Sequence, residues 1–279
     1  MTSKQTYITQ EVGASEHLAW IYIIRKSRVF PTARLSLNGH IELMPKPLPK
    51  LTFHYGSSTT IISQASNDLP ATLTYDQPIT IRARPGTNLW RKPPHTDIDN
   101  APTFLIPTPI NIHKFHSARV TLSANWSTSH DQGGLVLYIP DEDATKWLKA
   151  GIECEEGEPW VGTAATRRWS DWSSVPLGKK EGSKVTVQVE REVEEGEKVE
   201  SLWVYIIDEE TGEKVAIRQI NWWFKHDILD KKVTTDSEKN RCLLIGLYAA
   251  RPRVPEGEGR EHEELVVNLE GFEVKLFDD

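Results

Sequence analysis

The chain contains 279 residues, of which 38% are hydrophobic and 26% charged, the composition of an ordinary soluble globular protein. Its 33 basic and 40 acidic side chains give a formal net charge of −7. Binding to a nucleic-acid backbone needs clustered positive charge, and no apolar run approaches the roughly 20 residues that span a bilayer. We therefore expect neither a nucleic-acid nor a membrane partner.

The N-terminal residues, MTSKQTYITQEVGASEH, lack the apolar core of a secretory signal. The chain has two cysteines, Cys154 and Cys242, which lie far apart in the sequence. Thiols without a secretion signal are typical of a reducing compartment. We therefore expect a cytoplasmic protein.

The first 80 residues are richer in Thr, Ser and Pro than the rest. Within them, the segment Pro45–Pro49 has proline at every second position, which fixes φ, removes hydrogen-bond donors and predicts an extended connector. We interpret residues 1–80 as an N-terminal extension that adds strands to the body formed by residues 81–279. A separate small lobe is the alternative.

Helical periodicity is almost absent, and the longest helix candidate, Asp141–Lys146, is at most about two turns. Elsewhere short β-branched and aromatic runs alternate with turn residues, which is the pattern of an antiparallel sandwich or barrel. The predicted strands are Trp20–Ile24, Lys50–Tyr55, Thr59–Ser63, Ala118–Trp126, Gly134–Ile139, Trp147–Glu153, Val161–Thr166, Val185–Glu190, Leu202–Ile207, Lys214–Gln219, Leu243–Ala249 and Leu265–Leu276.

Two of the connections have the sequence of hairpin turns. Glu155–Glu158 and Glu210–Glu213 each contain a glycine, which supplies the positive φ that such turns need. The charge-dense stretch after Val185 keeps valine at every second position and predicts a strand with one exposed face. We expect Glu192–Lys198 to be a polar loop.

Ten tryptophans are present, and five of them lie between residues 126 and 172. Indole rings serve hydrophobic cores and ligand platforms alike. In a strand over Trp147–Glu153, alternate residues face opposite sides. One side is apolar and predicts a core face: Leu148, Ala150, Ile152 and Cys154. The other side carries Trp147, Lys149, Gly151 and Glu153.

The second of these faces suggests a binding groove, because a glycine between large polar groups lets a ligand approach the backbone. Solvated surface charges at Lys149 and Glu153 are the alternative. Other segments supply indole, guanidinium, imidazole, amide and hydroxyl groups suited to a sugar. The predicted ligand-binding residues are Trp90, Arg91, His130, Gln132, Trp147, Lys149, Arg168, Ser170 and Trp172. Glu153 and Asp171 are the candidate acid and base if the groove is catalytic.

Cofactor and metal signatures are weak. His113 and His116 are spaced i, i+3, but no matching cysteine or carboxylate cluster follows them. The phosphate loop and the dinucleotide fingerprint are absent from the sequence. We therefore expect no metal and no cofactor.

Several motifs occur together in one order: Asn88-Leu89-Trp90, Phe104-Leu105, Asp131–Leu135, Trp147–Glu153, Ser170–Ser173 and Ile245–Ala250. Jointly they resemble the regulation-of-enolase-like family of domains of unknown function, over roughly residues 85–277. The resemblance implies an all-β, concanavalin A-like jelly-roll sandwich whose concave sheet carries the ligand. It leaves residues 1–80 unexplained.

Jelly-roll glucanases carry their nucleophile and general acid in an E-x-D-x-x-E run. The nearest run here is Glu153–Gly157, in which Glu155 is expected at a hairpin turn. This departure favours lectin-like binding of a carbohydrate or similar polar ring compound. Two alternatives stay open: an enzyme that acts on a glycoside or small metabolite in the same groove, and a cytoplasmic regulator that binds a protein such as a glycolytic enzyme.

Overall fold

The computed structural model describes residues 20–25, 28–35, 41–42, 69–140, 145–177, 184–225 and 241–278. All regular secondary structure in these ranges is β-strand, so the predicted all-β class is confirmed. The strands predicted at Lys50–Tyr55 and Thr59–Ser63 lie outside the described residues, as do residues 141–144 of the predicted helix. The last residue of that helix, Lys146, instead begins a strand.

Among the described residues before 69, three antiparallel strands form a sheet of their own: β1 (Trp20–Arg25), β2 (Arg28–Leu35) and β3 (Ile41–Glu42). The next two strands, β4 (Thr72–Tyr75) and β5 (Ile79–Ala83), pair with β19 (Leu265–Leu276) in the main body. The main body therefore includes strands from the last part of the segment 1–80. The packing of residues 1–68 stays a prediction.

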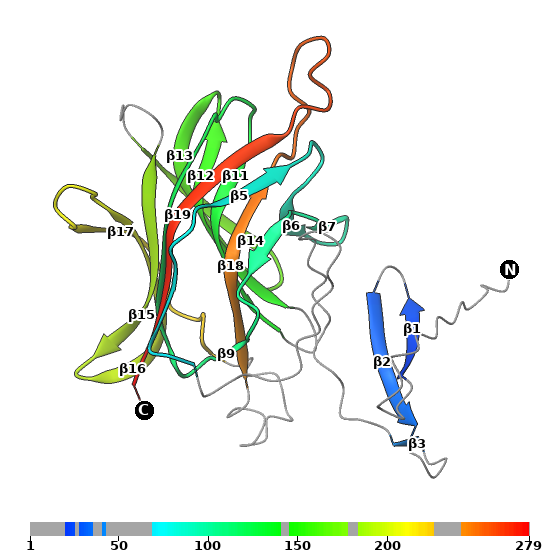
Figure 1. The fold of residues 1–279 in the computed structure, drawn as a ribbon, viewed down its shortest axis with the longest axis vertical. Helices are drawn as coiled ribbons and strands as arrows, with labels where there is room; N and C mark the ends of the chain where they lie inside the picture. Colours follow the sequence, from blue (N-terminus) through cyan, green and yellow to red (C-terminus); the bar gives the residue numbers. More distant parts are fainter. Residues whose placement is uncertain are drawn as a thin grey trace, which may run out of the picture.

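The main body is a sandwich of two seven-stranded sheets (Figure 1). The first sheet has the order β17-β16-β15-β10-β19-β4, with β5 also on β19. Its remaining strands are β10 (Phe115–Ala124), β15 (Val185–Glu194), β16 (Glu197–Ile207) and β17 (Lys214–Ile220).

The second sheet has the order β14-β13-β12-β11-β18-β8, with β9 also on β18. Its strands are β8 (Thr103–Leu105), β9 (Ile110–Asn111), β11 (Gln132–Ile139), β12 (Lys146–Glu155), β13 (Glu158–Thr166), β14 (Ser170–Pro176) and β18 (Cys242–Ala250). We call it the site sheet. Sequence-distant strands lie side by side in both sheets, as β10 does with β19 and β11 with β18.

Two tight turns show how local sequence sets the register. Glu156-Gly157 joins β12 to β13 as predicted, and both residues have positive φ, as a two-residue hairpin requires. Glu195-Gly196 joins β15 to β16 in the same way. The predicted loop over Glu192–Lys198 is therefore wrong, because β15 continues to Glu194, β16 begins at Glu197, and only Glu195 and Gly196 form the turn.

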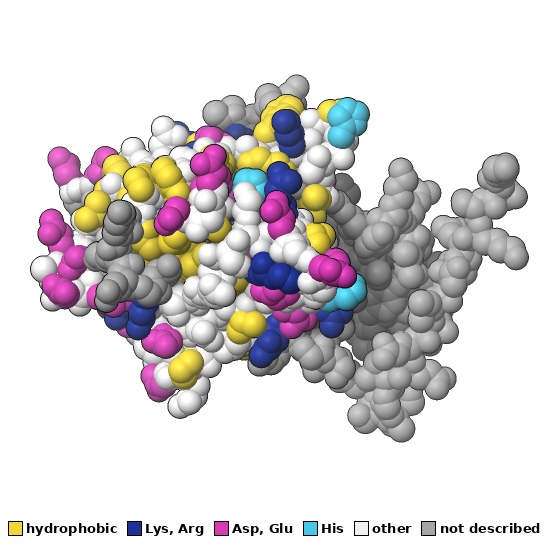
Figure 2. All heavy atoms as spheres, turned by 90° about the horizontal axis from the view of Figure 1, so that it is seen from above, with side chains coloured by type: hydrophobic (Ala, Val, Ile, Leu, Met, Phe, Trp, Pro, Cys, Tyr) yellow, Lys and Arg dark blue, Asp and Glu magenta, His cyan; other side chains and the backbone are white. Residues whose placement is uncertain are grey.

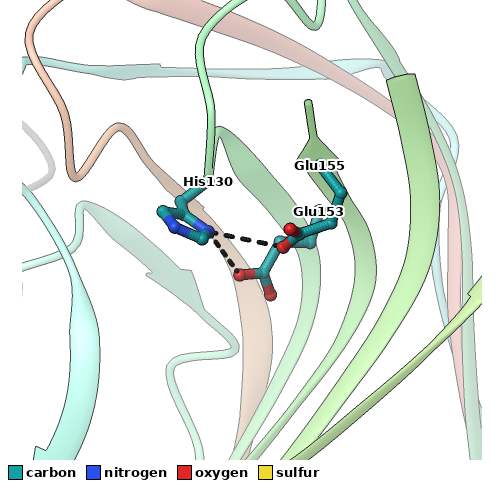
Figure 3. A group of neighbouring side chains, drawn as sticks. All are labelled: His130, Glu153 and Glu155. Atoms are coloured by element: carbon teal, nitrogen blue, oxygen red, sulfur yellow. Dashed lines mark ion pairs between the residues drawn. The ribbon is translucent and has the colours of Figure 1, made fainter. Parts of the chain in front are cut away.

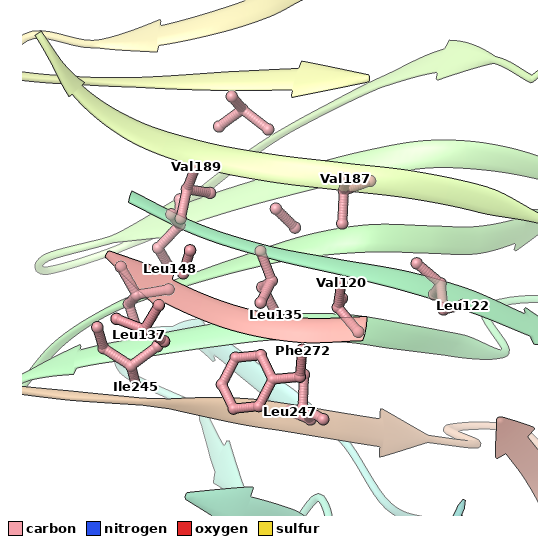
Figure 4. Packing of buried hydrophobic residues seen from close by; sticks show 14 of the residues in the cluster. Val120, Leu122, Leu135, Leu137, Leu148, Val187, Val189, Ile245, Leu247 and Phe272 are labelled. Atoms are coloured by element: carbon pink, nitrogen blue, oxygen red, sulfur yellow. The ribbon is translucent and has the colours of Figure 1, made fainter. Parts of the chain in front are cut away.

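The hydrophobic core lies between the two sheets. Alternate residues of each central strand point inward and pack against the facing sheet, as expected from a period of two. Figure 4 shows this packing for Val120 and Leu122 of β10, Val187 and Val189 of β15, Leu135 and Leu137 of β11, Leu148 of β12, Ile245 and Leu247 of β18, and Phe272 of β19.

A second apolar cluster covers part of the outer face of the site sheet. Its buried members are Leu89, Val136, Tyr138, Trp147, Ala164, Leu244 and Tyr248. Leu89 belongs to a hairpin of β6 (Leu89–Lys92) and β7 (Thr96–Asp99) that was not predicted from the sequence. This cover explains why β11 and β18 are buried along their whole length.

Candidate functional site

The outer face of the site sheet carries the residues that the alternation of β12 predicted. Leu148, Ala150, Ile152 and Cys154 lie in the core between the sheets. Trp147, Lys149 and Glu153 therefore share the opposite face. Trp147 belongs to the apolar cluster under the hairpin, whereas Lys149 and Glu153 are the buried charges of this face of β12.

A row of glycines crosses this face. Gly134 of β11, Gly151 of β12 and Gly162 of β13 are direct cross-strand partners. A Cβ at Gly151 would lie 1.9 Å from the carbonyl oxygen of Gly133, and one at Gly134 would lie 2.2 Å from that of Ala150. Strand packing thus requires glycine at 134 and 151, and the sequence interpretation of Gly151 as an opening for a ligand is not supported.

Lys149 reaches from one side of the glycine row to the other. Its Nζ donates a hydrogen bond to Oε1 of Gln132 at 2.5 Å and lies 5.5 Å from the ring centroid of Trp90. Only 2% of Lys149 is exposed. Burial lowers the pKa of its ammonium group to about 8, although the negative charge of Glu153 acts to raise that pKa.

Glu153 is a buried carboxylate that its neighbours keep ionised. Its Oε2 accepts a hydrogen bond of 2.9 Å from Nε1 of Trp172, and its Oε1 lies 3.5 Å from Nδ1 of His130. Burial by itself raises the pKa of Glu153, but His130, Lys149 and Trp172 together hold that pKa below its usual value.

His130 stands between Glu153 and Glu155 (Figure 3). Its Nδ1 lies 3.4 Å from Oε1 of Glu155, and its backbone φ of 68° is uncommon for a residue other than glycine. The hydrogen bond to Glu153 raises the pKa of the His130 imidazole. Gln132 holds this loop because its Nε2 donates to the carbonyl oxygen of His130 at 3.1 Å.

The structure brings together five of the predicted residues: His130, Gln132, Lys149, Glu153 and Trp172. We call these five residues, with Glu155, the polar cluster. Glu155 is two residues after Glu153, so in a strand it faces the same side. The sequence prediction places Glu155 in a turn, but in the structure it is the last residue of β12.

Trp160 was also missed as a site residue. It lies directly opposite Glu153 on β13 and so shares its face. The strand around it was predicted to begin at Val161, which left Trp160 outside the alternation; β13 begins earlier, at Glu158.

Other predicted residues hold the fold. The Arg91 side chain donates to Oδ1 of Asp97 at 2.9 Å and to the carbonyl oxygens of Thr145 and Arg167. Its backbone N–H donates to Oγ of Ser170 at 2.9 Å. Arg91 and Ser170 thus fasten the β6–β7 hairpin to the site sheet.

Trp90 packs against the covered apolar cluster, and Trp147 is buried within it with 2% exposed. Arg168 is exposed in the turn between β13 and β14. These three side chains therefore differ in their surroundings from the polar cluster, although Trp90 contacts it through Lys149.

Asp171 lies on the other side of the sheet. It pairs with Ala165, whose side chain is in the core, whereas its neighbour Trp172 pairs with Ala164 on the outer face. Its carboxylate forms an ion pair of 2.8 Å with Arg218 of β17. The structure does not bring Glu153 and Asp171 together as an acid and base, because strand alternation separates them.

The polar cluster is anchored from beneath by an ion pair. Asp131 and Arg251 are fully buried, and the Arg251 guanidinium donates to both carboxylate oxygens of Asp131 at 2.8 Å. Asp131 also accepts from the N–H of Thr128 at 3.0 Å. These contacts fix the chain on which His130 stands.

Two surface features lie away from the polar cluster. A hollow of about 350 Å³ is lined by Arg84, Pro85, Glu261, His262 and Glu264, so it contains none of the predicted site residues. On the face drawn in Figure 2, acidic and basic side chains are interspersed rather than gathered into one basic area. Within the described residues, no helix is long and apolar enough to cross a membrane.

Two facing antiparallel sheets, with sequence-distant strands side by side, define the class of the protein: an all-β, concanavalin A-like jelly-roll sandwich. The sequence matches the family model described as "Protein of unknown function (DUF1349)" over residues 68–275. The chain belongs to this family, which confirms the predicted resemblance. The match begins just before β4 and includes both sheets of the sandwich.

Two relatives and one solved structure are similar to this chain. An uncharacterized protein of Emericella nidulans is 36% identical over 200 residues, which are 71% of this chain and 86% of that protein. "Regulation of enolase protein 1" of Saccharomyces cerevisiae is 27% identical over 100 residues, 36% of this chain and 48% of that protein. A crystal structure of a functionally unknown yeast protein superposes with a TM-score of 0.50 and 17% identity, covering 75% of this chain and 98% of the other.

Proposed function

We propose that the polar cluster on the site sheet binds a carbohydrate or a similar polar ring compound. The observation that carries the proposal is the pairing of Trp172 with Glu153. The indole is 38% exposed, while its N–H is fixed on a carboxylate that is 9% exposed. Because that N–H is engaged, the indole presents its apolar ring to solvent, which suits the C–H face of a sugar.

The neighbouring groups suit hydroxyl recognition. Carboxylate oxygens accept hydrogen bonds from hydroxyls, and an ammonium and an amide donate to them. Glu153 supplies the acceptor oxygens and is held by Trp172, while Lys149 and Gln132, each 2% exposed, are held by each other beneath the surface. Because these side chains are already ordered, less conformational entropy is lost when a ligand binds.

The energetic cost of the cluster also supports a functional role. A buried ammonium and a buried carboxylate lose hydration that their mutual attraction repays only in part, and apolar replacements are often as stable. Buried groups with shifted pKa values, such as Lys149 and Glu153, are therefore typical of functional sites.

Calorimetric titration of a broad glycan panel tests the proposal. We expect at least one glycan to bind, and binding to be lost in Trp172→Ala and in Glu153→Gln. Trp203→Ala is the matched control, because Trp203 lies on the other sheet and should leave binding intact. No binding by the whole panel at high concentration, or unchanged binding in Trp172→Ala, overturns the proposal.

Glycoside hydrolysis is a second candidate, favoured by one distance. One carboxylate oxygen of Glu153 lies within 4.8 Å of one of Glu155, so the two carboxyl groups are neighbours, as the pair of a retaining glycosidase must be. A low pKa at Glu153 suits a nucleophile rather than a proton donor. Release of reducing ends that Glu153→Gln abolishes would support hydrolysis; release that persists in a Glu153→Gln, Glu155→Gln double variant would exclude these residues.

A protein partner is the third candidate, and it rests on the name of the yeast relative, regulation of enolase protein 1. A purified glycolytic enzyme such as enolase is the direct probe. Co-sedimentation of a stoichiometric complex would support this function, and separate sedimentation of the two proteins at micromolar concentration would count against it.

A further inference from the structure

His130, Glu153 and Glu155 form a compact group of potential metal ligands that the sequence did not predict. Glu153 and Glu155 alternate along β12, so both project from its outer face. His130 precedes β11 and is held beside them by backbone hydrogen bonds, from its own N–H to the carbonyl of Cys154 and from Cys154 N–H to the carbonyl of Asp131. Figure 3 shows the three side chains converging on one point.

Two of the three separations within the group match those around a tetrahedral metal ion. Zn²⁺ binds imidazole nitrogen and carboxylate oxygen at about 2.1 Å, which places tetrahedral ligand atoms about 3.4 Å apart. Nδ1 of His130 lies 3.5 Å from Oε1 of Glu153 and 3.4 Å from Oε1 of Glu155. The third separation, between one carboxylate oxygen of Glu153 and one of Glu155, is at most 4.8 Å.

One of the oxygens is left without a hydrogen bond. Oε1 of Glu155 is buried and accepts none from the described residues, although it stands at ion-pair distance from His130. A protonated His130 has a single Nδ1–H, which it must share between the two carboxylates. A metal ion at the point of convergence would satisfy both oxygens together.

Neighbouring groups orient the three ligands. The Trp172 indole N–H occupies Oε2 of Glu153 and leaves Oε1 facing His130, while Gln132 supports the His130 backbone. Outer contacts of this kind fix the ligands of metal sites. Lys149 and Arg253 are the nearby cations that act on Glu153 and His130, and they reduce the affinity for a metal ion without occupying the site.

We propose that His130 Nδ1, Glu153 Oε1 and Glu155 Oε1 bind one zinc-type divalent cation, with the fourth coordination position open to solvent or ligand. Binding replaces the Nδ1 proton of His130, which is released to solvent. The inference goes beyond carbohydrate binding, because it needs no glycan.

Calorimetric titration of metal-stripped full-length protein with Zn²⁺, without glycan and up to about 1 mM, tests the site. We expect one Zn²⁺ per chain, and affinity at least tenfold lower in Glu155→Gln and in His130→Gln. Glu158→Gln is the matched control, because Glu158 is exposed directly across the hairpin from Glu155 and should leave affinity unchanged.

A second measurement reports coordination directly. Co²⁺ in the same site should give the visible absorption of a tetrahedral ion, and Glu155→Gln should remove it. No Zn²⁺ binding by the wild-type chain, or wild-type affinity in both Glu155→Gln and His130→Gln with circular dichroism unchanged, overturns the proposal. Glycan titrations repeated in EDTA separate a failed metal site from a failed carbohydrate site.

Discussion

The outer face of the site sheet has two halves that stand on the same strands but differ in chemistry. At one end of β12, Trp147 lies with Tyr138 and Leu244 in a dry apolar cluster under the β6–β7 hairpin. At the other end, Glu153 and Gln132 belong to a network of hydrogen-bonded polar groups beside the half-exposed Trp172. The glycine row of Gly134, Gly151 and Gly162 lies between them.

The two halves contribute differently to the stability of the fold. Apolar area removed from water stabilises the fold roughly in proportion to its size. Buried charges return little net stability, because desolvation offsets their attraction. Substitutions in the covered half should therefore change folding, and substitutions in the polar half should change pH dependence and binding.

The largest expected effect is in the covered half. Trp147→Ala should lower the free energy of unfolding by about 3–5 kcal/mol, because it removes a buried indole and leaves a cavity. Urea unfolding measures it. Trp169→Ala is the control: this side chain is 58% exposed, and its loss should cost within about 0.5 kcal/mol. Equal losses in the two variants would contradict the contrast between the halves.

The glycine row should show a smaller, graded effect. Gly151→Ala places a Cβ 1.9 Å from a backbone oxygen, and relief of that clash should cost about 1–3 kcal/mol. At Gly162 the nearest contacts are the Cβ and Oε2 of Glu153 at 3.1 and 3.3 Å.

Since the overlap at Gly162 is much smaller than the overlap at Gly151, Gly162→Ala should cost less than Gly151→Ala in the same urea experiment. It should instead weaken ligand binding through Glu153. A greater loss of stability at Gly162 than at Gly151 would show that the backbone at Gly151 is free to move.

The polar half should make the free energy of unfolding depend on pH. The pKa of Lys149 is about 8 in the folded chain, against an ordinary value of 10.5. Between these values the unfolded chain binds more protons, so stability rises with pH across this window. The contribution of Lys149 should grow by roughly 1–2 kcal/mol from about pH 8 to about pH 9.5.

Lys149→Met should flatten this rise, and the exposed Lys92→Met should not. The comparison is made below the pH range in which tyrosines ionise. Burial raises the pKa of Tyr138 and Tyr248 in the folded chain, so tyrosine ionisation at higher pH would change the free energy of unfolding independently of Lys149. Identical pH profiles for wild type and Lys149→Met would refute the assignment of a buried ammonium at this position.

The relation between sequence and site is clearest at two neighbouring residues. The sequence prediction assigns Asp171 and Trp172 to one groove, yet adjacent residues of a strand face opposite sides. No strand is predicted over the polar run Ser170–Ser173, so the sequence does not indicate that its neighbouring side chains face opposite sides. In β14, Trp172 hydrogen-bonds Glu153 in the polar cluster, whereas Asp171 forms an ion pair with Arg218 of the other sheet.

The sequence by itself determined the all-β class, the hairpin turn at Glu156-Gly157 and the division of β12 into a core face and a site face. These follow from local backbone preference and a period of two, which each segment carries within itself. Tertiary structure alone decided that a distant hairpin covers Trp147, and that His130 meets Glu153 and Glu155. Those contacts depend on the pairing and register of strands far apart in the chain, which no local pattern specifies.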